Sequence, residues 1–153
     1  MKNIIFICGC IFTILFSAYP AYAVERCIMC GMDAQKSETK FVVQVIQGTK
    51  KIPEATYSLC SLHCLVLIIS NVGMEKIGSV MVRDYNTVTG DYDSGEMIDA
   101  KKGYYLVESK LLPKGSMYPF MLVFSTEKTA DIYRKTYGGK ILNWKGVLDY
   151  TKP

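Results

Sequence analysis

Short apolar segments separated by glycine and polar residues follow one another along the chain, and their periods differ. Three segments of the first half are rich in β-branched, aromatic or alternating apolar residues, as strands are: residues 41–47, 55–59 and 77–85. Between the last two lies an almost wholly apolar run, 62–71, which is long enough for a buried helix. Ser61 can cap the start of this helix, and Gly73 its end. The first half therefore predicts the order strand, strand, helix, strand.

The second half has the same order of elements. Strands are expected at three further segments: residues 103–108, 120–124 and 140–144. A helix capped by Ser125 carries an aromatic stripe and ends at Gly138-Gly139. We therefore predict an α+β fold of two homologous β-β-α-β units, at about residues 38–85 and 97–150, in one small domain.

The N-terminal segment has the pattern of a secretory signal. An apolar run, 4–16, follows Lys2 and leads to a small-x-small sequence that ends at Ala23. The run is shorter than the 20 or so apolar residues that a membrane helix needs. We predict that residues 1–23 are a signal peptide and that the mature chain, 24–153, is exported to the periplasm without membrane insertion after cleavage. Two of the six cysteines fall in the signal and are left out of the argument.

The charges of the mature chain are nearly balanced. Loss of Lys2 with the signal leaves 17 of the 18 basic residues against 14 acidic ones. The basic side chains are scattered and do not form the stripe that is typical of a nucleic-acid surface. The sequence also has no nucleophile elbow, no glycine-rich phosphate loop and a single histidine. We therefore expect neither nucleic-acid binding nor an enzyme.

The segment C-I-M-C-G-M, near the start of the mature chain, is its most sulfur-rich part. It offers two thiolates, Cys27 and Cys30, and two thioethers, Met29 and Met32, and such soft donors select Cu(I) over harder divalent ions. Gly31 lets the backbone turn tightly enough for the sulfurs to converge. Zinc would be bound by the cysteines but gains little from methionine. We therefore predict a Cu(I) site, with zinc as the alternative metal.

Other interpretations of these sulfurs stay open. Export favours disulfides, either Cys27–Cys30 or Cys60–Cys64. The C-x-x-C motif also occurs in thiol–disulfide oxidoreductases, although these place it at a helix start after a strand. Methionines often do no more than fill a core. A zinc or other heavy-metal site with a structural or sensory role is a further alternative.

A second group of potential ligands, C-S-L-H-C, begins the predicted helix of the first half. Cys60 and Cys64 are four residues apart and share a helix face, and the start of a helix favours the thiolate. Together with the C-x-x-C pair they suggest a split site that holds one ion. His63 is either a further ligand or a surface or core residue. In the second half, Met117 stands in a loop fixed by proline and glycine, where it is either a thioether donor or packed on Tyr118.

A set of motifs occurs in order along the mature chain: C-I-M-C-G-M at 27–32, V-R-D-Y at 82–85, I-D-A at 98–100, Tyr105 with Val107, and Y-G-G-K-I-L at 137–142. In these motifs the chain resembles the NosL family. Members of that family are exported copper-binding accessory proteins, associated with assembly of the copper centres of nitrous oxide reductase. The resemblance covers nearly the whole mature chain.

The resemblance implies two homologous β-β-α-β units, Cu(I) as the bound ion, and its delivery to a client copper enzyme or a maturation transporter complex. Four positions match the family's metal motif: Cys27, Met29, Cys30 and Met32. The chain lacks the lipidation box of many members, so we expect a soluble protein, as a monomer or a metal-bridged dimer, with a membrane-anchored form as the alternative. Where the family usually has Pro-Met-Gly, this chain has Lys114 in the middle, and Met117 could supply the thioether only by a shift.

Overall fold

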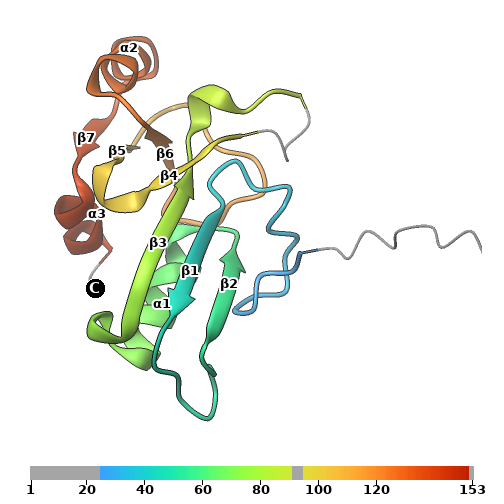
Figure 1. Cartoon of the computed structure of the whole chain (residues 1–153). Coiled ribbons are helices and arrows are strands. Elements are labelled where there is room, and N and C mark those ends of the chain that lie inside the picture. The colour runs from blue at the N-terminus through green and yellow to red at the C-terminus, as the bar shows by residue number, and fades with distance from the viewer. Residues whose placement is uncertain (1–24, 91–94, 152–153) are drawn as a thin grey trace, which may run out of the picture.

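The protein is described by a computed structural model that covers residues 25–90 and 95–151, and the predicted signal at 1–23 lies outside this part. Within it the chain forms two antiparallel sheets with helices packed against them (Figure 1). The predicted α+β class is confirmed. No helix among the described residues combines the length and the apolar character that crossing a bilayer requires.

The first sheet has the strand order β2-β1-β3-β4. Its strands are β1 (Phe41–Val45), β2 (Ala55–Leu59), β3 (Ile77–Arg83) and β4 (Met97–Asp99). Phe41, Val43 and Val45 of β1 are buried, because alternate side chains of a strand point to the same face. Helix α1 (Leu62–Val72) packs on that sheet, behind β1 and β3 in Figure 1, and its inward residues close the core: Leu62, Cys64, Leu65, Ile68 and Val72. Ser61 and Gly73 cap α1 as predicted.

The second sheet has the order β6-β5-β7 and is shorter. Its strands are β5 (Tyr104–Val107), β6 (Met121–Phe124) and β7 (Lys140–Leu142). Helix α2 (Glu127–Tyr137) packs against all three strands, and α3 (Trp144–Tyr150) packs against β5 and β7. All four residues of β6 are buried, so this strand is apolar without alternation. Single 3₁₀ turns link the larger elements: η1 (Met74–Lys76), η2 (Tyr85–Thr87) and η4 (Ala100–Lys102).

The two halves have the same arrangement of strands. In each, the first strand in sequence lies in the middle and pairs with the second and third strands on either side, always antiparallel. A helix connects the second strand to the third in both halves. The topology thus agrees with two β-β-α-β units, while their common origin and the exact unit boundaries stay predictions.

One large core cluster joins the halves. It contains Phe41 and Leu59 of the first sheet, Tyr105 and Val123 of the second, and Val147 of α3. A smaller cluster lies under α2 and contains four buried residues: Leu106, Leu122, Phe124 and Ala130. The halves therefore pack as a single body, as expected for one small domain.

Four predicted boundaries are wrong, and one of them is the end of the strand expected at 41–47, since β1 ends at Val45. Thr126, not Ser125, caps α2: its hydroxyl accepts the N–H of Thr129 at 3.2 Å, while the N–H of Ser125 is directed to Asp84. The strand expected at 140–144 ends at Leu142, because Asn143 caps the short helix α3, which was not predicted. The strand expected at 77–85 ends at Arg83, because Asp84 caps the 3₁₀ turn η2, which begins at Tyr85; β4 was not predicted.

Replacing Thr126 by alanine is expected to reduce the free energy of unfolding by about 1 kcal/mol, because the first turn of α2 loses its cap. Ser125→Ala is the matched control and should change it by less than about 0.5 kcal/mol. Urea unfolding followed by circular dichroism measures both. An equal loss for the two variants would contradict the assignment of the cap to Thr126.

Candidate metal centre

The C-x-x-C segment lies at the tip of a tight turn. The two sides of this turn meet in a β-bridge between Arg26 and Asp33. The N–H of Cys27 donates to the carbonyl of Met32 at 2.8 Å, and the N–H of Gly31 donates to the carbonyl of Cys27 at 2.8 Å. Gly31 has φ of 76°, a conformation that costs a residue with a Cβ more than it costs glycine. The turn thereby brings Cys27 and Cys30 to one side, as Gly31 in the sequence had suggested.

The other two cysteines lie where β2 passes into α1. Cys60 directly precedes the cap residue Ser61, whose hydroxyl accepts the N–H of Cys64 at 3.5 Å. The first helical turn then places the sulfur of Cys64 at 3.8 Å from that of Cys60. The carbonyl of Cys60 is held in turn by the hydroxyls of Ser37 at 2.6 Å and Thr39 at 3.3 Å. The start of α1 is therefore fixed on the segment that leads into β1.

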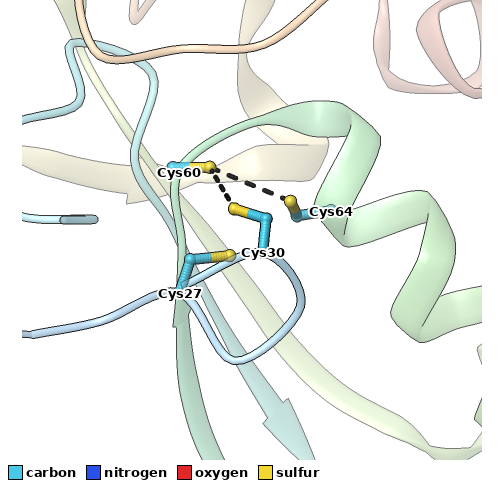
Figure 2. A group of neighbouring side chains, drawn as sticks. All are labelled: Cys27, Cys30, Cys60 and Cys64. Carbon is cyan, nitrogen blue, oxygen red and sulfur yellow. Dashed lines mark hydrogen bonds between the residues drawn. The ribbon is translucent and has the colours of Figure 1, made fainter. Parts of the chain in front are cut away.

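The turn and the helix start bring the four thiols together (Figure 2). All four sulfurs lie within 4.8 Å of one another, and those of Cys30 and Cys60 are 3.4 Å apart. Four thiolates at about 2.3 Å from a tetrahedral ion lie about 3.8 Å from each other, so the cluster has the dimensions of a metal site. All four cysteines are free thiols. Cys27, Cys60 and Cys64 are 1%, 0% and 0% exposed, whereas Cys30 is exposed.

Hydrogen bonding and burial shift the pKa values of the three buried thiols, Cys27, Cys60 and Cys64. Hydrogen bonds from the thiols of Cys60 and Cys64 hold the pKa of Cys27 far below its usual range, and backbone N–H groups of Cys60 and Cys30 add to this. The bond to Cys27 in turn raises the pKa of Cys60, and it raises the pKa of Cys64 to about 12. The cluster thus favours one thiolate surrounded by thiols that donate to it. A cation bound among the sulfurs would displace the thiol protons and neutralise the thiolates in their place.

The remaining predicted ligands lie in different surroundings. Met29, Met32 and Met117 are half-buried and pack on the large core cluster that includes Cys27 and Cys64. His63 is exposed on α1 and lines a hollow with Tyr118 and other residues, outside the group of four sulfurs. The structure thus brings the four cysteines together and does not bring His63 to them, and ligation by the methionines or by His63 stays a prediction.

Several residues that shape the site were not predicted. Ser37, Thr39 and Ser116 form a network of hydroxyls, in which the hydroxyl oxygens of Thr39 and Ser116 are 2.6 Å apart. The guanidinium of Arg83, 3% exposed, donates to the carbonyls of Gln35 at 2.9 Å and of Ser37 at 2.7 Å. Ser37 and Thr39 are polar and precede a strand, a pattern that predicts an exposed loop. No local signal in the sequence therefore indicates that they are buried.

Glu25 fastens the turn to the sheet through hydrogen bonds from Lys40, just before β1, and Ser58 of β2. Burial raises the pKa of Glu25, but the hydrogen bonds from Lys40 and Ser58 outweigh it, and the pKa is lowered overall. A lowered pKa means that the ionised form stabilises the folded state. This contribution is fully present above the unfolded pKa of about 4.3 and is lost as the pH falls through the folded value.

Glu25→Gln should therefore be less stable than the original chain at neutral pH, and the difference should shrink below about pH 4. Unfolding of the reduced, metal-free protein in urea, repeated from neutral to acidic pH, measures it. Glu54→Gln, at an exposed position in the loop before β2, is the control and should follow the original chain at every pH. A Glu25→Gln deficit that is unchanged in acid would show that its carboxylate charge is not what holds the turn.

Comparisons with known proteins agree with this picture. No curated protein matches the sequence. The crystal structure of the copper chaperone NosL from Shewanella denitrificans superposes with a TM-score of 0.62 at 20% identity, over 82% of this chain and 92% of that one, and this likeness shows a shared fold. The sequence model of the NosL family matches residues 20–150. The chain therefore belongs to the NosL family.

Proposed function

We propose that this protein is a periplasmic metallochaperone that binds Cu(I) at Cys27, Cys30, Cys60 and Cys64 and passes it to a client copper enzyme or its assembly complex. The observation that carries the proposal is the convergence of four free thiols, from two separate segments, within 4.8 Å. Membership of the NosL family supports the choice of copper, because NosL of Shewanella denitrificans, which has the same fold, is a copper chaperone. It also agrees with the expectation that the chain is not an enzyme.

The donor set suits a soft ion. Thiolates are polarisable and bind Cu(I), a d10 cation that accepts two, three or four ligands. Half-buried Met29, Met32 and Met117 pack on the same core cluster as Cys27, and their thioethers are the proposed source of selectivity for copper. Nitrous oxide reductase and its assembly complex are the proposed destination of the copper. Export rests on the predicted signal at 1–23.

A structural zinc site is the second candidate, and a specific observation favours it. Sulfur separations of 3.4 and 3.8 Å come close to the edge of a four-thiolate tetrahedron, which is the commonest structural zinc geometry. A dithiol enzyme that uses Cys27 and Cys30 has less support, because this C-x-x-C lies in a turn and not at the start of a helix. Zinc and copper therefore need a direct comparison.

Reduced protein titrated with Cu(I) and, separately, Zn(II) against a competing chelator makes that comparison. Cys60→Ser should abolish tight binding of both ions, because Cys60 is the buried sulfur that contacts Cys30 and Cys64. Tight binding of Zn(II), together with no uptake of Cu(I) from the competing chelator, would favour the structural zinc site. Binding that survives Cys60→Ser unchanged would contradict both candidates.

Met29→Ala and Met32→Ala test the thioethers separately. Each should lower Cu(I) affinity by roughly ten- to hundredfold, the range for groups that support metal ligands, and leave Zn(II) affinity nearly unchanged. Met74→Ala is the matched control, since Met74 is exposed beyond the far end of α1 from the cysteines. No change in Cu(I) affinity for either variant would count against a role of the methionines in selecting copper.

A further inference from the structure

The four sulfurs differ sharply in access to solvent. Cys27, Cys60 and Cys64 are buried, whereas Cys30 is exposed at the tip of its turn, with its thiol directed back to the cluster (Figure 2). We propose that Cys30 is the exchange ligand of the site: the metal gives up this sulfur first to an acceptor thiolate, while the other three hold it. This inference rests on the proposed function and adds the order in which its ligands are replaced.

The three buried cysteines are held by their surroundings. Cys27 is 1% exposed, and its main chain forms hydrogen bonds with Met32 and Gly31 of the turn. Cys60 is fixed through its carbonyl by Ser37 and Thr39. Cys64 belongs to the first turn of α1 and is 0% exposed. Displacing any of these sulfurs would require the packed core to open.

Cys30 needs no such opening. Because the residue is exposed, rotation about its Cα–Cβ bond can carry the thiol from the cluster into solvent while the backbone of the turn stays in place. Ile28 and Gly31 of the same turn are exposed as well, so this turn lies at the surface of the protein. An acceptor sulfur can therefore approach the ion on the side of Cys30.

The exchange balances without a redox step. The acceptor thiol loses its proton and forms a bond to Cu(I), the bond from Cu(I) to the sulfur of Cys30 breaks, and the freed thiolate of Cys30 takes up a proton. Copper remains Cu(I) throughout. The intermediate holds the ion between the buried sulfurs and the acceptor, and later exchanges complete the transfer.

Alkylation of the Cu(I)-loaded protein tests the order. Iodoacetamide labelling, located by peptide mass spectrometry, should leave all four cysteines protected at first. Added glutathione, as the acceptor thiol, should expose Cys30 to labelling while the other three stay protected. Ile28→Ser, a change at an exposed position of the same turn, should keep this order. Labelling of Cys60 or Cys64 before Cys30 would overturn the inference.

Cysteine variants distinguish a defined order of ligand replacement from a mere difference in solvent exposure among the thiols. Cys30→Ser should still bind Cu(I), with affinity lower by roughly ten- to hundredfold, and should transfer it to glutathione faster than the original chain. Cys64→Ser should lose far more affinity. Equal losses for the two variants would overturn the inference while leaving copper binding intact. A chain that takes up no Cu(I), with all four cysteines labelled equally with and without copper, would overturn the proposed function and the inference together.

Discussion

The site depends on the contact between an N-terminal turn and the start of α1. Neither the C-x-x-C turn nor the β2–α1 junction has more than two cysteines, so a four-sulfur site needs both segments. The turn is held to the sheet by Glu25 with Lys40 and Ser58, and the junction is held by Ser37 and Thr39. These polar bonds set the relative position of two segments 30 residues apart, and the sulfurs meet as a consequence.

The second half of the chain also stabilises the contact between the N-terminal turn and the start of α1. Glu38 exchanges hydrogen bonds with Lys114 through backbone and side chain, and a Cβ at Gly115 would stand 2.5 Å from the carbonyl oxygen of Lys36. The hydroxyl of Ser116 joins the network that holds Cys60, through Thr39. Such close approach explains why glycine stands at position 115. The site is thus built from the N-terminal turn and the first unit, and a loop of the second unit stabilises it.

Much of the fold follows from local patterns. The strand β2, the caps of α1 and the glycine end of α2 agree with the sequence, because alternation, capping and left-handed glycine act within a few residues. The errors have different causes. Ser125 and Thr126 are adjacent and both suited to capping; in the structure Thr126 is the cap, and the backbone N–H of Ser125 is directed to Asp84, 41 residues away. Helix α3 is seven residues long, too short for a clear period.

The sequence by itself determined the sulfur chemistry: two cysteine pairs at short spacings, one in a glycine turn and one at a helix start, and the motifs of the NosL family. The tertiary structure decided which of the candidate ligands meet. It brought together the four cysteines, left His63 in a separate hollow, and buried three thiols while leaving Cys30 exposed. The reason is physical. Residue type and spacing fix what a side chain can bind, but distance between segments and access to solvent arise only when the chain packs.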